Sequence, residues 1–143
     1  MSAFGAWVTA SNDARSTTRG TGAASWVGIV DDDDSLRMAL ARALRVNGIR
    51  VETFGSAEEF LRRDVAGEPD CIVLDIHLGG LSGFDLQDLL EAGGNAPPII
   101  FITAHEDMLA ERARSGGAFG YLRKPFETQA LIALLRQHLT DAE

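Results

Sequence analysis

The residues from Trp26 to Asp34 read WVGIVDDDD, an apolar run that ends abruptly in four aspartates. An unbroken apolar run of this length is typical of a strand buried on both faces, as in parallel sheets covered by helices. Four more apolar or β-rich runs follow, and helix-like segments alternate with them. This alternation predicts an α/β fold with a doubly wound five-stranded parallel sheet and helices on both faces. The five runs are Trp26–Val30, Arg50–Phe54, Cys71–Leu74, Pro98–Thr103 and Phe119–Leu122.

The composition of these runs indicates the order of the strands. Runs one, three and four are almost wholly apolar, whereas Arg50–Phe54 alternates between polar and apolar residues and Phe119–Leu122 is short and contains Gly120. We therefore expect the second and fifth runs at the edges. With right-handed crossovers, the strand order 2-1-3-4-5 meets this condition, which is a flavodoxin-like arrangement. In that order, ligands bind beyond the carboxyl ends of strands 1 and 3, where the winding reverses.

Five amphipathic segments are expected to cover the sheet. The first ends at Asn47-Gly48, the third ends at Gly93-Gly94, and the last begins near Glu127. Ser56-Ala57-Glu58-Glu59 has the pattern of a capping box and opens the second helix. The fourth segment, Glu106 to Ser115, has a thin apolar stripe and is expected to be the least firmly packed helix. The apolar residues that mark the other four faces are Leu36, Leu40, Ala43, Leu44, Phe60, Leu61, Leu86, Leu89, Leu90, Leu131, Leu134, Leu135 and Leu139.

Length, charge and composition exclude several classes of protein. The 143 residues suffice for one domain, expected over 26–143, with a flexible N-terminal extension over 1–25 that is rich in Ser, Thr, Ala and Gly. The net charge is −8; Arg15, Arg19 and Asp13 give residues 1–25 a charge of +1, so residues 26–143 carry −9. That charge argues against direct binding of nucleic acid by this domain. No apolar stretch is long enough to span a membrane and no secretory signal is visible, so we expect a cytoplasmic location.

Polar residues suited to a metal or phosphoryl site follow four of the expected strands. Asp31 and Asp32 come after the first strand, Asp75 follows the third, Thr103 ends the fourth, and Lys124 follows the fifth. Because the carboxyl ends of parallel strands meet at one edge of the sheet, these side chains are expected to converge. Clustered carboxylates repel one another unless a cation binds, and Mg²⁺ is the expected occupant because it prefers oxygen ligands.

Each of these residues also has a purely structural interpretation. The acidic run could be a solvated surface, with Asp34 or Ser35 capping the next helix, and Asp75 could cap the loop that follows it. Thr103 could be an ordinary β-branched strand end. The chemical alternative makes Asp75 a carboxylate nucleophile toward phosphorus. Lys124, the one lysine in the chain, would then supply a compact positive charge opposite it.

Four segments resemble the signature segments of response regulator receiver domains, the CheY-like superfamily, with a likeness to FixJ-type regulators. They stand in the family's order and at its spacing, and the resemblance covers about residues 26–139. The segments are IVDDDDSLRMAL at 29–40, IVLDIHLGGLSGFDL at 72–86, IIFITAHED at 99–107 and FGYLRKPF at 119–126.

The resemblance implies a role for each matching residue of the acidic cluster. Asp75 would accept a phosphoryl group from a histidine kinase or phosphotransfer protein. Mg²⁺ would be bound directly by Asp32, Asp75 and the main-chain carbonyl of His77, while Asp31 would act through water. Such a domain is a switch and not an enzyme, because it catalyses only its own phosphorylation and dephosphorylation.

The resemblance also implies how the switch would operate. Thr103 and Lys124 would contact the phosphoryl group, and Tyr121 would turn inward on activation. The surface formed by the fourth helix, the fifth strand and the fifth helix would then change shape toward an effector partner or a second copy of the chain.

Two positions depart from the family pattern or vary within it. Gly79, followed by Gly80, stands where the family often has proline, which predicts a looser loop. His105 stands where receivers vary. Two further interpretations come from the residues themselves: His138 is expected to lie on a helix surface, and Cys71, the only cysteine, in the core.

Three other functions fit parts of the pattern. A haloacid-dehalogenase-type phosphatase also combines an aspartate nucleophile, a hydroxyl and a lysine, but it has a second aspartate where this chain has His77. A flavin-binding module shares the expected topology, although no hydroxyl-rich phosphate loop is visible. A degenerate receiver that serves only as a scaffold is disfavoured because the key side chains are all present.

Overall fold

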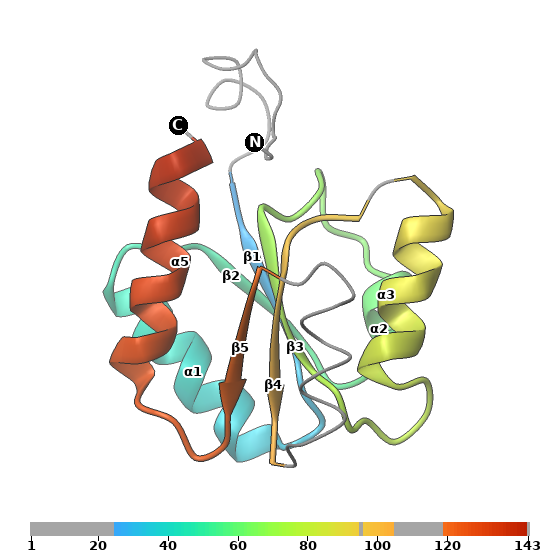
Figure 1. The fold of residues 1–143 in the computed structure, drawn as a ribbon, viewed down its shortest axis with the longest axis horizontal. Helices are drawn as coiled ribbons and strands as arrows, with labels where there is room; N and C mark the ends of the chain where they lie inside the picture. The colour runs from blue at the N-terminus through green and yellow to red at the C-terminus, as the bar shows by residue number, and fades with distance from the viewer. Residues whose placement is uncertain (1–24, 95, 105–118, 143) are drawn as a thin grey trace.

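The computed structural model describes residues 25–94, 96–104 and 119–142, and strands alternate with helices along these segments (Figure 1). The order of the elements confirms the alternation expected from the apolar runs. The strands are β1 (Val27–Val30), β2 (Val51–Phe54), β3 (Cys71–Asp75), β4 (Ile99–Thr103) and β5 (Gly120–Arg123). The helices are α1 (Asp34–Val46), α2 (Ala57–Leu61), α3 (Gly83–Ala92) and α5 (Thr128–Ala142).

The strands form one parallel sheet in the order β2-β1-β3-β4-β5. This confirms the expected 2-1-3-4-5 order, with the alternating run and the short glycine-containing run at the two edges. The register aligns the carboxyl ends of neighbouring strands, since Asp75 pairs with Ile102 and Thr103 pairs with Arg123. The residues that follow these strands therefore emerge at the same edge of the sheet.

Two hydrophobic clusters cover the two faces of the sheet. Figure 1 shows α1 and α5 on one face and α2 and α3 on the other. On the first face, Leu44 of α1 and Leu135 of α5 are buried against β1 and β3. On the second face, Phe60 of α2 and Leu86 of α3 are buried together with Phe101 of β4. Burial on both faces explains why the central strands are apolar throughout.

Two leucines assigned to helical core faces are exposed instead. Leu61 is the last residue of α2, and Leu89 lies on α3. Leu61 follows the buried Phe60, and adjacent side chains on a helix point about 100° apart, so Leu61 lies off the face that packs on the sheet. The predictions for Phe60 and Leu86 on the same two helices are confirmed, because both side chains are fully buried.

The helix ends are fixed by polar side chains, with one correction to the sequence prediction. Asp33 caps α1 by accepting a hydrogen bond from the N–H of Leu36 (3.1 Å), so the expected cap at Asp34 or Ser35 is wrong. Ser56 caps α2 as expected, by accepting from the N–H of Glu59, but Oε1 of Glu59 accepts from the N–H of Gly55 and not from that of Ser56, so the predicted capping box is only half formed. The α3 helix begins with a capping box formed by Ser82 and Asp85. Each of these side chains satisfies an N–H that the first turn of a helix leaves unpaired.

The expected stops of α1 and α3 are confirmed. Asn47 caps the end of α1 and Gly48 follows with a φ of +82°, while Gly93 caps α3 and Gly94 follows with a φ of +81°. Glycine tolerates this left-handed conformation because it has no Cβ atom. The Lys124–Pro125 peptide bond is cis.

His138 is buried, and the expectation that it lies on a helix surface is therefore wrong. Its side chain is 5% exposed, its ring contacts the ring of Phe119 edge-on, and its Nε2 lies 3.0 Å from the carbonyl oxygen of Asp70. Because a carbonyl oxygen only accepts, Nε2 carries the proton and donates to it. Cys71 is a buried core residue, as expected. Burial raises the pKa of its thiol, which keeps it protonated at neutral pH.

Several expectations fall outside the described residues. They include the tail over residues 1–24, the fourth helix from Glu106 to Ser115, and His105. In the parts of the chain that the structure describes, no helix is long and apolar enough to cross a membrane.

Candidate functional site

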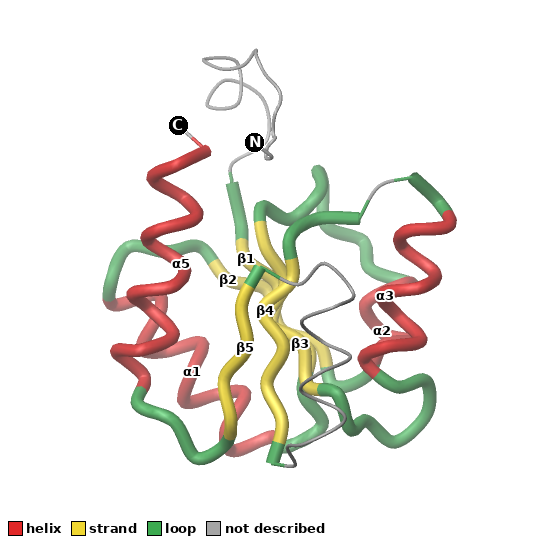
Figure 2. The backbone as a smooth tube through the Cα atoms, in the orientation of Figure 1, coloured by secondary structure: helices red, strands yellow, loops and turns green. Residues whose placement is uncertain are grey.

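The parallel strands bring the candidate residues together at the carboxyl edge of the sheet, at the bottom of Figure 1. Asp31 directly follows β1, Asp75 is the last residue of β3, Thr103 is the last residue of β4, and Lys124 directly follows β5. Figure 2 shows the loops that leave β1, β3 and β5 at this same edge. The convergence predicted from strand ends is thus confirmed for these four residues.

Lys124 forms ion pairs with two buried carboxylates. Its Nζ lies 3.0 Å from Oδ2 of Asp31 and 3.2 Å from Oδ2 of Asp75. Asp31 is fully buried, Asp75 is 4% exposed, and the lysine side chain is 18% exposed. Two carboxylates therefore share one ammonium, which leaves this side of the site with an excess of negative charge.

Asp32 completes an acidic cluster with the geometry of a metal site. One carboxylate oxygen from each of Asp31, Asp32 and Asp75 lies within 4.8 Å of the others. Asp32 is exposed to solvent, which gives an ion a route of entry. Oδ2 of Asp31 is shielded from solvent and, among the described residues, has no hydrogen-bond partner beyond its ion pair with Lys124. Oxygen donors with uncompensated charge fit a hard divalent cation such as Mg²⁺.

The surroundings of Asp75 change its ionisation. Burial raises its pKa to about 6, and the negative charge of Asp31 acts in the same direction. The charge of Lys124 and the hydrogen bond from the N–H of His77 oppose this shift but do not cancel it. Burial alone would lower the pKa of Lys124, yet the hydrogen bonding and charge of the two carboxylates raise it. At neutral pH the site therefore holds a charged lysine and a carboxylate that is easily protonated.

Main-chain contacts fix the two loops that carry the carboxylates. Oδ1 of Asp31 accepts from the N–H of Asp33 (2.9 Å), and Oδ1 of Asp75 accepts from the N–H of His77 (3.1 Å). The guanidinium of Arg37 donates to the carbonyl oxygen of Asp31 (2.7 Å). Arg37 is not among the site residues predicted from the sequence, because a polar residue in the first turn of an amphipathic helix is typical of the surface.

Gly83 is a second residue of the site that is not predicted from the sequence. A Cβ atom added there would lie 2.5 Å from the carbonyl oxygen of Asp75 and 2.9 Å from Cα of Ile76. The N–H of Gly83 donates to the carbonyl oxygen of Ile76 at 2.9 Å. The start of α3 therefore packs directly on the backbone at Asp75, and only glycine fits there.

Thr103 and Tyr121 flank the cluster on the neighbouring strands. Thr103 is fully buried, and its carbonyl oxygen accepts from the N–H of Lys124 at 2.6 Å. Tyr121, on β5, is half-buried against the cluster of apolar residues between the sheet and α2 and α3. His77 is exposed, and its N–H points to Asp75. One end of the sheet thus holds Asp31, Asp32, Asp75, His77, Thr103 and Lys124, whereas Tyr121 lies inside β5, paired with Phe101 of β4.

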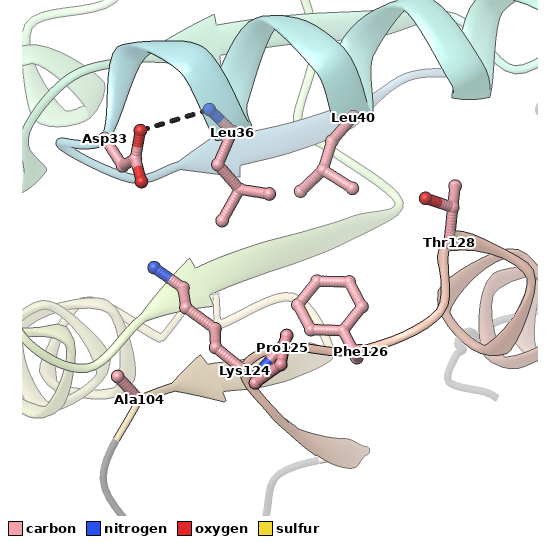
Figure 3. Close-up of a pocket in the computed structure, with 8 residues that line it drawn as sticks. All are labelled: Asp33, Leu36, Leu40, Ala104, Lys124, Pro125, Phe126 and Thr128. Atoms are coloured by element: carbon pink, nitrogen blue, oxygen red, sulfur yellow. Dashed lines mark hydrogen bonds between the residues drawn. The ribbon is translucent and has the colours of Figure 1, made fainter.

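A cavity of about 390 Å³ opens beside Lys124, between α1 and the segment that links β5 to α5. Figure 3 shows Leu36 and Leu40 of α1 facing Phe126 across it, with Lys124 at one end. The apolar walls shelter the aliphatic stem of the lysine from water, while its ammonium reaches the carboxylates. The cavity is lined by Asp33, Leu36, Leu40, Ala104, Lys124, Pro125, Phe126 and Thr128.

Comparisons with known proteins agree with this geometry. Nodulation protein W of Bradyrhizobium diazoefficiens is 44% identical over 105 residues, which cover 73% of this chain and 46% of that protein. The transcriptional regulatory protein FixJ of Azorhizobium caulinodans is 40% identical over 114 residues, 79% of this chain and 54% of that protein. The crystal structure of a response regulator receiver protein from Burkholderia phymatum matches with a TM-score of 0.70 and 39% identity, over 82% of this chain and 96% of that one.

This chain spans about half the length of the curated relatives it matches. Its residues 27–136 match the family described as the response regulator receiver domain. That match covers more than half of the chain and includes Asp31, Asp32, Asp75, Thr103 and Lys124. The chain therefore belongs to the response regulator receiver domain family of two-component signalling.

Proposed function

We propose that this chain accepts a phosphoryl group on Asp75 and acts as a phosphorylation-dependent switch. The observation that carries the proposal is the pair of ion contacts from Lys124 to Asp31 and Asp75 in a buried acidic cluster. Membership of the receiver family supports the same role. A histidine kinase or a phosphotransfer protein is the donor that this family implies.

The transfer makes one bond and breaks one. An oxygen of the Asp75 carboxylate attacks phosphorus, while the bond from phosphorus to the donor's imidazole nitrogen breaks. The nitrogen keeps the bonding electron pair and takes up a proton from water. Phosphoryl transfer depends on positioning and on neutralisation of charge, and not on further covalent steps by the protein.

The residues around Asp75 supply that positioning. Lys124 holds its ammonium 3.2 Å from the attacking carboxylate, where it also offsets the charge of the incoming phosphoryl oxygens. The N–H of His77 orients the carboxylate by donating to its other oxygen. Mg²⁺, held by Asp31, Asp32, Asp75 and the carbonyl of His77, supplies further positive charge against the phosphoryl oxygens when bound.

Thr103 and Tyr121 are the proposed switch residues. Thr103 stands one strand away from Asp75, with a hydroxyl suited to a phosphoryl oxygen. The hydroxyl of Tyr121 is shielded from solvent and has no hydrogen-bond partner among the described residues. A buried hydroxyl without a partner is unfavourable, so a second arrangement in which it finds one would be favoured and could serve as the other state of the switch.

The proposal is tested by phosphorylation with acetyl phosphate and Mg²⁺. We expect the intact protein to gain the mass of one phosphoryl group, and the variant Asp75→Asn to gain none. Asp88→Asn, which changes an exposed aspartate on α3, is the control and should be labelled normally. Labelling of Asp75→Asn would place the acceptor elsewhere and would contradict the proposal.

A turnover assay with phosphate monoesters separates the switch from a phosphatase of the haloacid-dehalogenase type. A switch releases phosphate from itself and shows no sustained turnover of phosphate monoesters. His77 occupies the position two residues after Asp75 where such a phosphatase has its acid–base aspartate. Multiple turnovers of a monoester would favour the phosphatase instead.

The output of the switch would be carried by another part of a longer protein or by a separate partner. FixJ of Azorhizobium caulinodans is named a transcriptional regulatory protein, and this chain matches 54% of it. We propose that phosphorylation changes the surface near β5 and α5 toward an effector partner or a second copy of the chain. Residues 26–143 would form this receiver unit, with residues 1–25 as an extension.

A further inference from the structure

The loop between β3 and α3 contains two exposed glycines in succession, Gly79 and Gly80. The two ends of the loop are joined by the hydrogen bond from the N–H of Gly83 to the carbonyl oxygen of Ile76. Between these ends, two adjacent glycines give the backbone more conformational freedom than any other pair of residues. The order of this loop therefore depends on contacts with neighbouring elements.

Glu58 of α2 makes such a contact with the tip of the loop. Its Oε2 accepts a hydrogen bond from the N–H of Leu81 at 3.0 Å, across 23 positions of sequence. A Cβ atom at Gly80 would collide with the same carboxylate, so the glutamate lies directly against the loop backbone. The hydrogen bond from Leu81 lowers the pKa of Glu58, which keeps the carboxylate charged and the hydrogen bond charge-assisted.

The helix that carries Glu58 is firmly placed. Oγ of Ser56 caps it, and the side chains of Ala57 and Phe60 are fully buried in the core. Glu58 lies between those two buried residues. A carboxylate on a packed and capped helix is a better anchor for a mobile glycine pair than one on another loop.

The loop also carries the main chain beside Asp75. The N–H of His77 donates to Oδ1 of Asp75, and Leu78 and Leu81 pack against the core cluster on the α2 and α3 side. If Leu81 is released, the glycine pair is held at one end only, and its conformational freedom extends to the main chain near His77. The anchoring of the loop tip and the geometry at the acidic cluster are therefore connected through a few residues of backbone.

We infer that Glu58 is a positioning residue for the cation site: by holding Leu81, it keeps the β3–α3 loop ordered with the main chain at His77 beside Asp75. This inference rests on the proposed function, in which the carbonyl of His77 is a metal ligand. Without the contact, the loop samples more conformations, and binding of a cation must order them. The entropy lost in that ordering weakens the binding.

The first test is a titration of the unphosphorylated full chain with MgCl₂ alone, in which calorimetry measures the affinity. We expect Glu58→Ala to weaken Mg²⁺ binding by about threefold to tenfold. Residues that contact a metal ligand directly change the affinity by about tenfold to a hundredfold, and Glu58 acts from further away. Leu81 should also exchange its amide hydrogen faster than in the wild type. Circular dichroism then shows whether the variant remains folded.

Glu59→Ala is the matched control. Glu59 is on the same helix, and its Oε1 also accepts a backbone N–H, that of Gly55 at 2.8 Å, but Gly55 is not in the β3–α3 loop. Both variants remove one negative charge at neighbouring positions, so a general effect of charge on Mg²⁺ binding appears in both. We expect Glu59→Ala to bind Mg²⁺ with the wild-type affinity.

A rescue variant distinguishes positioning from a merely structural role. Gly79 has no atoms within 4 Å of an added Cβ and does not have a left-handed φ, so neither of these conditions excludes proline there. Proline restricts the backbone without any contact to Glu58. Gly79→Pro should therefore restore much of the Mg²⁺ affinity that Glu58→Ala loses.

The outcomes separate the inference from the proposed function. If the wild type binds Mg²⁺ and Glu58→Ala binds it equally well, the inference is wrong while the metal site stands. If the wild type binds no Mg²⁺, the proposed metal site fails. If Glu58→Ala does not fold, Gly80→Ala tests the same contact, because its methyl group displaces the carboxylate and should weaken Mg²⁺ binding. Wild-type affinity in a folded Gly80→Ala would contradict the inference.

Discussion

The ammonium of Lys124 lies 3.2 Å from Oδ2 of Asp75, although β5 and β3 are separated by β4 in the sheet. The lysine side chain reaches across the end of β4 and also contacts Asp31, which follows β1. One cation thus connects the ends of three strands. The stability of the metal-free protein and its capacity to bind a cation and a phosphoryl group depend on the same few charges. Variants of single residues can separate the effect on stability from the effect on binding.

The ionisation of Asp75 predicts how stability depends on pH. Its pKa in the folded protein, about 6, is above the ordinary value of 3.8 expected for the unfolded chain. Between these two pH values the folded state therefore binds more protons than the unfolded state. Without metal, the free energy of unfolding should rise as pH falls through 6. At pH 7, Asp75→Asn should be more stable than the wild type by about 2 kcal/mol.

Urea denaturation at a series of pH values, in the presence of a chelator, measures this difference. The advantage of Asp75→Asn should shrink as pH falls from 7.5 toward 5, because the wild-type carboxyl becomes protonated and neutral. A difference that stays constant over this range would show that Asp75 does not titrate with a raised pKa.

Removal of Lys124 tests the shared ion pair. Lys124→Met keeps an apolar stem but leaves Asp31 and Asp75 buried without a counter-charge. We expect the metal-free protein to lose about 3 kcal/mol of stability near neutral pH, as is typical when one partner of a buried pair is removed. Arg42→Met, which removes an exposed cation on α1, is the control for loss of one positive charge.

Binding of Mg²⁺ should stabilise the native state. A ligand that binds only the folded protein adds about 2.7 kcal/mol at a concentration one hundred times its dissociation constant. Asp32→Asn should largely abolish the upward shift in melting temperature with Mg²⁺ while leaving the metal-free protein at least as stable, because Asp32 is exposed and repelled by the other carboxylates. Asp64→Asn, at an exposed position outside the cluster, should retain the full shift.

The contact of Gly83 with the backbone of Asp75 predicts a sharp contrast between two glycines. Gly83→Ala places a methyl group against main-chain atoms of Asp75 and Ile76, which cannot move aside cheaply. We expect it to lower the free energy of unfolding by about 2 kcal/mol, a value typical of overpacking. Gly79→Ala, where nothing lies within 4 Å, should be neutral or slightly stabilising. Equal effects of the two variants in chemical denaturation would contradict this account.

The burial of His138 predicts a structural role at the other end of the sheet. His138→Ala removes the hydrogen bond to the carbonyl oxygen of Asp70 and the ring contact with Phe119. We expect a loss of about 2 kcal/mol in the free energy of unfolding, since a buried carbonyl loses its donor and a ring is removed from the core. Gln137→Ala, at the exposed neighbouring position, should have little effect. Phosphoryl acceptance should survive in both variants.

The strands, their order and the residues at their carboxyl ends could be predicted from the sequence alone. Buried central strands must be apolar on both faces, so the runs ending at Val30 and Leu74 were recognisable, as was the alternating edge run from Arg50 to Phe54. The parallel arrangement then placed Asp31, Asp75 and Lys124 together. These features depend on local patterns and on topology rules, which a single sequence carries.

Contacts between side chains of different elements could not be predicted in this way and follow from the packing of the folded chain. Whether His138 and Leu61 are buried depends on where a helix ends and how it rotates on the sheet, and the apolar pattern predicted both incorrectly. The contact of Glu58 with Leu81 joins positions 23 residues apart, and it arises because α2 packs beside the β3–α3 loop. Such contacts depend on distances between elements, which are fixed by the packing of the whole core and not by the residues nearby in the chain.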